Sequence, residues 1–241
     1  MATPNQQDAR WQSAWPDAVA FATVLAVAWW LRASATDLVW SLWLSSLVVG
    51  YAIILWSIFR PALTVAAYAW RDRAEVEETL AKDPRGAMLV GGIGLVGGLF
   101  LVAFFTVHFG GFHYVHSQFL ISMFPLDAYH RSADLATYVE VARRYWWALP
   151  SAFLAQRAAF MQRTFDNPSV PPDFSVTAAA IAARKATSGS SPSRMAAPYV
   201  AVVKMHLLIF VFVGTHAAHL DGFWLYALVY TVYFFPWKRA R

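Results

Sequence analysis

The chain of 241 residues alternates between long apolar runs and short polar segments that carry most of its charge. A helix needs about 20 mostly apolar residues to cross the roughly 30 Å hydrocarbon core of a bilayer. Several runs reach or approach that length, which predicts an all-α fold, a single polytopic membrane bundle of about six transmembrane helices. The predicted spans cover residues 16–31, 38–59, 90–124, 145–161, 198–218 and 223–237.

The first run, residues 16–31, has a competing interpretation as a signal peptide. Residues 33–35, Ala-Ser-Ala, resemble the small-residue site at which a secretory signal is cleaved. Trp29 and Trp30, however, are bulky where a signal peptide tapers, and aromatic pairs are typical of the membrane–water interface. We therefore expect a first span that ends in an interfacial tryptophan pair.

The longest apolar stretch, residues 87–126, could form one long helix or two spans folded at Gly110-Gly111. Basic residues decide between them, because cytoplasmic loops carry an excess of Lys and Arg. One span places 13 of the 19 basic residues on one side, in the N-terminus, the 60–86 loop, the 163–197 loop and the tail, and four on the other. The charge pattern therefore favours one span, with both termini cytoplasmic.

The segments between the spans differ in character. Residues 71–85 carry Glu and Lys at spacings typical of a solvated helical face. Residues 127–144 are polar and are predicted to lie outside the cell membrane, before a fourth span that contains Arg157. Residues 163–197 are rich in Pro, Ser and Gly, which predicts a partly disordered loop.

Composition supports the membrane class. Charged residues make up 14% of the chain, against about 25% in a soluble domain, which is too few to cover a globule. The formal net charge is +5, but the basic residues flank the apolar runs, where they face anionic lipid, so nucleic acid is excluded as a partner. The predicted partners are the lipid bilayer and, within it, another membrane protein or further copies of this chain. The absence of cysteine excludes disulfides and thiolate chemistry.

Six of the seven histidines fall in or next to two predicted spans. They are His108, His113 and His116 in the third span and His206, His216 and His219 in the fifth and at its outer end. Both spans run in one direction, so His108 and His206 should share a depth, with His116 next above. His113, His216 and His219 would form an outer group. Imidazole is a common metal ligand, so the pattern predicts a site for a metal ion or haem, first at the inner group.

The residues also allow a simpler interpretation of the histidines. A buried histidine can bond to a neighbouring helix, which contributes roughly 1 kcal/mol. The spans lack a carboxylate ligand apart from Asp17, and no H-E-x-x-H motif occurs. Three functions stay open: an accessory or structural membrane component, a His-ligated metal or haem protein in redox chemistry, and a small-solute or proton carrier. The carrier ranks last because paired repeats with broken helices are missing.

Glycines suggest where the predicted spans approach each other. Gly94 and Gly98 form a G-x-x-x-G pair, and Gly110-Gly111 follow in the same span. Small residues let helix backbones come close in a membrane. We predict that the third span contacts the fifth along the face from His108 to Gly111.

Several short motifs resemble an uncharacterised bacterial multi-pass membrane family of unknown function. The similar pieces are His108-Phe109-Gly110 with His116, Pro198-Tyr199 with His206, and the Trp-rich residues 39–44. The family tends to carry a Glu where this chain has Ser45 or Ser46, and a Ser-His pair where it has Pro150-Ser151. The resemblance extends loosely over residues 15–235. It implies a protein of the bacterial inner membrane with unknown activity, and it singles out His108, His116 and His206.

Overall fold

The structure is a computed structural model that describes residues 4–71, 73–126, 132–157, 160, 203, 207–220 and 223–234. Over these residues the chain is helical and has no strand, which confirms the predicted all-α class. The described helices are α1 (Pro4–Trp30), α2 (Ala35–Arg71), α3 (Arg73–Lys82), α4 (Pro84–Met123), α5 (Leu135–Tyr145), the 3-10 helix η1 (Trp146–Ala148), α6 (Leu149–Ala155), the helix Leu207–Ala217 and α10 (Phe223–Phe234).

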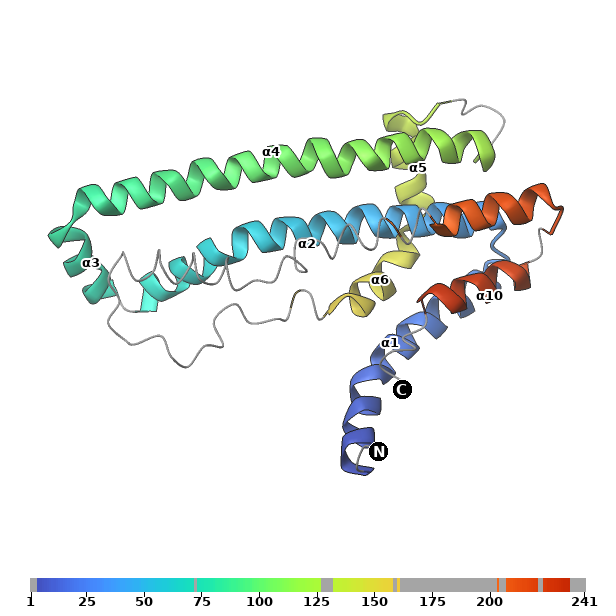
Figure 1. Cartoon of the computed structure of the whole chain (residues 1–241), viewed down its shortest axis with the longest axis horizontal. Coiled ribbons are helices and arrows are strands. Elements are labelled where there is room, and N and C mark those ends of the chain that lie inside the picture. The colour runs from blue at the N-terminus through green and yellow to red at the C-terminus, as the bar shows by residue number, and fades with distance from the viewer. Residues whose placement is uncertain are drawn as a thin grey trace.

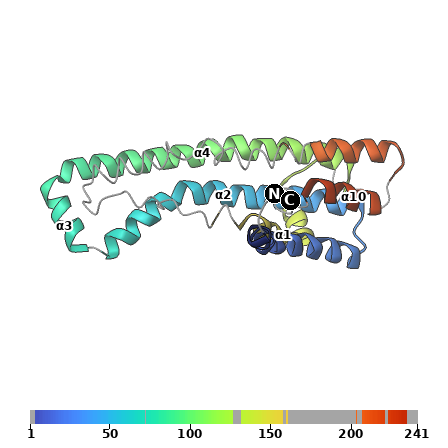
Figure 2. The same ribbon diagram turned by 60° about the horizontal axis from the view of Figure 1, so that its bottom comes forward.

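Two long helices, α2 and α4, form an antiparallel pair that α3 closes at one end (Figure 1). At the other end α5 runs across the pair (Figure 1), while Figure 2 shows the pair from a second side. There α10 lies beside α1, with the rings of Phe223 and Trp224 at 5.4 and 5.0 Å from the ring of Trp29. The end of α1 and the start of α10 therefore meet at the end of the pair that is opposite α3.

The helix α4 runs for 40 residues without interruption. Pro84 stands in its first turn, where a missing N–H costs nothing, and the carboxylate of Asp83 accepts the N–H of Gly86 at 2.9 Å. Gly110 and Gly111 lie within regular helix. The long apolar stretch is therefore one continuous helix and is not folded at the glycine pair, while its assignment as a single span stays a prediction.

The short helix α3 is the solvated helix predicted from the charged segment. Arg73 pairs with Glu77 at 2.9 Å and Lys82 with Glu78 at 2.6 Å, each four residues apart and largely exposed. The hydrogen bond from Lys82 lowers the pKa of Glu78. This helix contributes no large buried surface and serves as the connection between the two long helices.

The core lies at the end of the pair opposite α3, where α2, α4, α5 and the helix Leu207–Ala217 meet. Its buried apolar members include Leu38, Val39, Trp40, Trp43, Leu44, Leu120, Ile121, Phe124, Val141, Tyr145, Leu208, Ile209 and Phe212. A smaller cluster of Ile54, Phe105 and Phe109 joins α2 to α4 further along. Beyond it, towards α3, many large apolar side chains of both helices are exposed, among them Phe59, Leu63, Leu99 and Phe100.

Several predicted boundaries differ from the described helices. The helix α2 continues to Arg71, beyond the predicted second span 38–59, while its stretch that is long and apolar enough to cross a membrane covers Ala35–Arg60. Part of the predicted polar loop 127–144 forms α5, because Asp134 and Thr137 make a reciprocal cap that starts a helix. The predicted fourth span, residues 145–161, begins at the last residue of α5. Its described part contains the 3-10 helix η1 and the seven-residue helix α6. The loop 163–197 lies outside the described residues.

Two described segments are long and apolar enough to cross a membrane by length and composition, Ala35–Arg60 and Pro84–Met123. Shorter apolar helices cover Ala18–Trp30 and Leu207–Ala217. The six-span bundle stays a prediction.

Candidate functional site

Buried or half-buried polar side chains gather where α2, α4 and α5 meet, and we call this set the polar junction. Its members are Asp37, Trp40, Trp43, Ser46, His113, Ser117, Tyr138 and Tyr145. The four residues from α2 recur every third position, and at about 100° per residue each step shifts by about 60° around the helix, so they wind from one side of α2 to the other. The junction therefore lies at the same end of the helix pair as the apolar core.

Two tryptophans connect α2 to α4 through backbone carbonyls. The indole N–H of Trp40 donates to the carbonyl of Phe124 at 2.9 Å, and that of Trp43 donates to the carbonyl of His113 at 3.1 Å. Trp43 also stacks on Tyr138 of α5, with ring centroids 5.5 Å apart. Tyr138 in turn shares a 2.8 Å hydrogen bond with Ser117 of α4. Trp43 is thus in contact with both neighbouring helices.

His113 is the most buried of the described histidines, at 1% exposed. Its Nδ1 lies 3.0 Å from the carbonyl oxygen of Phe109, and its Nε2 lies 3.3 Å from the hydroxyl of Ser46. Because a carbonyl can only accept, Nδ1 carries the proton and Nε2 accepts from Ser46. Both ring nitrogens of a neutral imidazole are then engaged within the protein. These contacts give His113 a packing role between α2 and α4.

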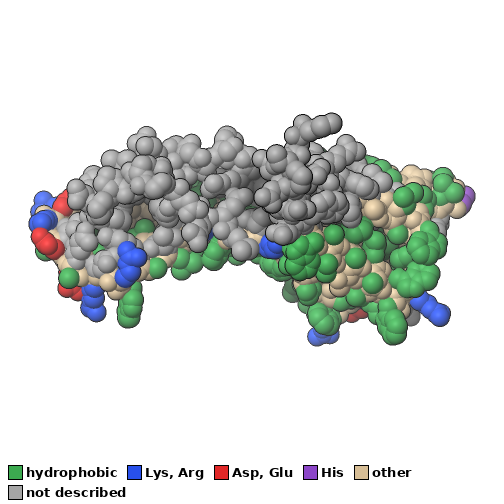
Figure 3. Space-filling view, turned by 90° about the horizontal axis from the view of Figure 1, so that it is seen from below, with side chains coloured by type: hydrophobic (Ala, Val, Ile, Leu, Met, Phe, Trp, Pro, Cys, Tyr) green, Lys and Arg blue, Asp and Glu red, His purple; other side chains and the backbone are tan. Residues whose placement is uncertain are grey.

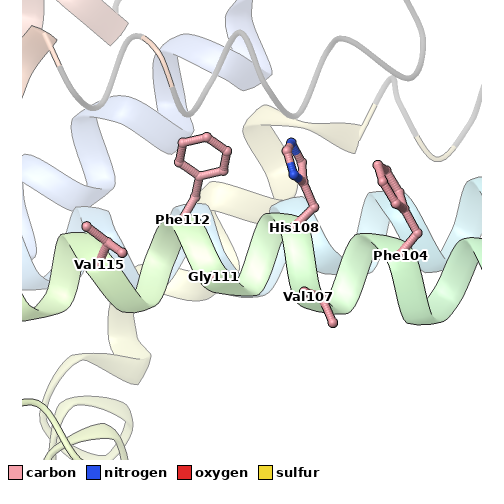
Figure 4. A pocket seen from close by; sticks show the side chains of 6 residues that line it. All are labelled: Phe104, Val107, His108, Gly111, Phe112 and Val115. Atoms are coloured by element: carbon pink, nitrogen blue, oxygen red, sulfur yellow. The ribbon is translucent and has the colours of Figure 1, made fainter.

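The rotation of α4 separates His108 from the other two histidines of the same helix. His108 is exposed, with its ring stacked 5.4 Å from Phe104 and edge-on 5.2 Å from Phe112 (Figure 4). At about 100° per residue, it lies roughly 140° around the helix from His113. His113 and His116 are both buried, with ring centroids 6.4 Å apart. The structure therefore brings His113 and His116 together and leaves His108 on another face.

The remaining histidines of the predicted site lie further out or outside the described residues. His216 is exposed, with its ring 5.7 Å from that of Phe124, and His219 adopts a left-handed φ of 56° at the end of its helix. Within the described residues no three His, Asp or Glu side chains are arranged to hold a metal ion, and the outer group of His113, His216 and His219 stays a prediction. His206 lies outside the described residues, and the inner group stays a prediction.

Asp37 joins the start of α2 to the end of α5. Its Oδ2 accepts the backbone N–H and the hydroxyl of Ser34 at 2.8 and 2.7 Å, while the N–H of Asp37 donates to the Ser34 hydroxyl at 3.2 Å. Its Oδ1 accepts from the Tyr145 hydroxyl at 2.8 Å and lies 3.4 Å from Arg144. Both carboxylate oxygens are therefore engaged, one in a helix cap and one between helices.

Sequence reasoning missed several members of the polar junction. The Ser34-x-x-Asp37 spacing is a capping-box signal and could have predicted the cap. The hydrogen bond between Asp37 and Tyr145 joins residues 108 positions apart, so no local sequence pattern could predict it. Ser46 is one of the two serines that stand where the resembling family tends to carry a Glu, and its hydroxyl forms the hydrogen bond with His113.

We expect Tyr145→Phe to lower the stability of the folded protein, because it removes one donor from a half-buried carboxylate and keeps the ring. Hydrogen bonds to charged groups contribute about 1.5–3 kcal/mol. Thermal unfolding in detergent measures the loss, with Tyr114→Phe as the control because Tyr114 is 55% exposed on α4. If Asp37→Asn alone and the double variant show strictly additive effects, the hydroxyl and the carboxylate do not interact.

The fold defines an all-α protein built on one long antiparallel helix pair with a polar junction at one end. Residues 3–169, which include α1 to α6, match a family of unknown function (DUF6498), and the chain belongs to that family. No curated protein matches the chain, and no solved structure does. The expectation of an uncharacterised family agrees with this result, while the motifs quoted for the resemblance stay a prediction.

Proposed function

We propose that this chain is a multi-pass integral protein of the bacterial inner membrane, with an accessory or structural role. The surface of α4 carries the proposal. Its most apolar stretch has a mean hydropathy of 2.4, yet only 6% of that stretch is buried. A core helix of a soluble protein is apolar because it is buried, and a signal sequence stands at the N-terminus. Neither description fits α4.

The exposed side chains of α4 are large as well as apolar. Those more than half exposed include Met88, Leu89, Ile93, Leu95, Val96, Leu99, Phe100, Val107 and Val115. Soluble monomers rarely expose a continuous apolar patch larger than a few hundred Å². Hydrocarbon would cover this surface without a cost in free energy. In Figure 3 most of the visible acidic side chains lie, together with basic ones, at the α3 end, where a cytoplasmic loop is predicted, and further basic side chains lie at the opposite end.

The polar junction supports an accessory or structural role. Trp40, Trp43 and His113 direct their polar atoms to neighbouring helices, and Asp37 caps one helix and bonds another. Polar groups used in this way hold helices in register within a bilayer. They are committed to contacts between helices and not to a bound substrate.

The topology can be tested with single cysteines, because the native chain has none. Ala81 in α3 and Ser132 before α5 are exposed and report the two ends of α4. The proposal places Ala81 in the cytoplasm and Ser132 outside. We expect an impermeant maleimide to label Ser132→Cys strongly and Ala81→Cys weakly on intact cells, and both equally after lysis.

Two results would contradict parts of the proposal. Equal labelling of the two positions on intact cells, or release of the protein from membranes by alkaline carbonate, would rule out the membrane placement. A haem absorption band or stoichiometric metal in the detergent-purified protein would replace the accessory role with the redox role and leave the placement intact.

A further inference from the structure

The helix α5 has three distinct faces along its eleven residues. The buried face consists of Thr137, Val141 and Tyr145. The exposed apolar face consists of Leu135, Val139, Ala142 and Trp146, the last at the start of η1. The exposed polar face consists of Glu140, Arg143 and Arg144. At about 100° per residue, the centres of these faces lie roughly 120° apart around the helix. A surface helix of a soluble protein needs only a buried face and a polar face.

The exposed apolar face is continuous. Its four residues are spaced by four, three and four positions, which aligns them in one stripe along a helix. Leu135 is 77% exposed and Trp146 is 63% exposed, so the described bundle leaves the stripe uncovered at both ends. The stripe therefore faces something other than the bundle.

Two contacts fix the direction in which the faces point. Tyr138, between the buried and the apolar face, stacks on Trp43 of α2. Arg144, between the buried and the polar face, lies 3.4 Å from Asp37, six residues nearer the start of α2. The apolar face consequently points towards the interior of the predicted second span, and the polar face points towards its outer end.

Hydrogen bonds to α4 indicate the depth of α5 in the predicted membrane. The side-chain amide of Gln118 donates to the carbonyl of Ala133 at 2.7 Å and accepts its N–H at 3.2 Å. Gln118 is six residues before Phe124, the C-cap of α4, which is about 9 Å along the helix axis. Helices that lie in a membrane interface reach a depth of about 5–10 Å. Because α5 runs across α2 and α4 (Figure 1), it would lie in the membrane plane.

We propose that α5 is an interfacial helix that rests on the outer leaflet of the bilayer. Its apolar face contacts acyl chains, the guanidinium of Arg143 contacts headgroup phosphates, and its buried face holds the bundle. Arg binds phosphate through its planar fork, and Trp146 suits the boundary between headgroups and chains. This inference rests on the proposed membrane placement and deepens it, because it names the lipid surface that this helix contacts.

Spin labels on single cysteines in proteoliposomes of phosphatidylethanolamine and phosphatidylglycerol test the inference. Ala142 and Ala136 are a matched pair, the same exposed residue on the apolar and the polar face, and Val139 and Glu140 are a second pair. We expect labels at 139 and 142 to collide more often with oxygen than with a water-soluble nickel chelate. Labels at 136 and 140 should show the reverse preference.

A label at Val96 of α4, which is 68% exposed, separates this inference from the proposed function. If position 96 is in lipid but positions 139 and 142 collide with nickel as often as 136 and 140 do, the interfacial helix is wrong and the membrane placement stands. Shielding of 139 and 142 from both reagents would also overturn the inference, since protein would then cover the stripe. Free access of nickel to position 96 would overturn the membrane placement, and the interfacial helix with it.

Discussion

Gly50→Val is expected to destabilise the α2–α4 pair, whereas Gly91→Val, the same change within α4, is expected to leave its stability nearly unchanged. A Cβ at Gly50 would stand 2.5 Å from Cζ of Phe109, and at Gly91 it would meet nothing within 4 Å among the described residues. Phe109 is 1% exposed and packs with Ile54 and Phe105, so its ring has no free space to enter. Overpacking of this kind costs about 1–3 kcal/mol.

Thermal unfolding of the two detergent-purified variants measures the difference. Valine is a slightly better helix former than glycine, so propensity alone would favour both variants. Each kcal/mol corresponds to about 2–4 °C in Tm for a chain of this size. Equal Tm values for the two variants would show that α2 and α4 are not closely packed at Gly50.

The glycines show how far a sequence motif determines a contact. The sequence marked Gly94, Gly98, Gly110 and Gly111 as positions of close approach, yet a Cβ at any of them meets nothing within 4 Å in the described part of the chain. The close approach is at Gly50, which belongs to no motif. A glycine permits two backbones to come near, but the arrangement of the helices decides which glycine has a partner opposite it.

The predicted contact between the third and fifth spans is described only in part, because residues 198–202 and 204–206 of the fifth span lie outside the described residues. In the described residues, α4 meets the helix Leu207–Ala217 near its own C-terminal end, where Phe119 and Phe210 have ring centroids 6.4 Å apart and Phe124 and His216 5.7 Å apart. The prediction placed this contact along the face from His108 to Gly111. The contact along that face stays a prediction.

Local patterns predicted more. The helical class and the charged helix α3 follow from residues that are neighbours along the chain, through apolar run length and i to i+4 charge spacing. The single helix α4 is favoured by the distribution of basic residues along the chain. The positions of the histidines depend partly on local sequence and partly on how the helices pack. Their depth follows from the rise of about 1.5 Å per residue. The face on which each lies depends on the partner helix, which buries His113 and His116 and leaves His108 exposed.

Trp43→Ala is expected to be among the most destabilising single changes in α2. The side chain is 1% exposed and touches α4 through the carbonyl of His113 and α5 through the ring of Tyr138. Its ring also packs edge-on against Trp40 at 5.5 Å. Removing a buried tryptophan leaves a cavity as well as a lost transfer free energy, which together cost about 3–5 kcal/mol.

Trp70→Ala on the same helix is the matched control, because Trp70 is 84% exposed and its loss should change the free energy of unfolding by about 0.5 kcal/mol or less. Trp43→Phe should fall between the two, since it keeps most of the ring contact with Tyr138 and loses the donor to His113. Thermal unfolding in detergent ranks the three variants. A Trp43→Ala variant as stable as Trp70→Ala would mean that the polar junction does not hold α2, α4 and α5 together. The intermediate rank of Trp43→Phe would then have no basis either, because the indole N–H would have nothing to stabilise.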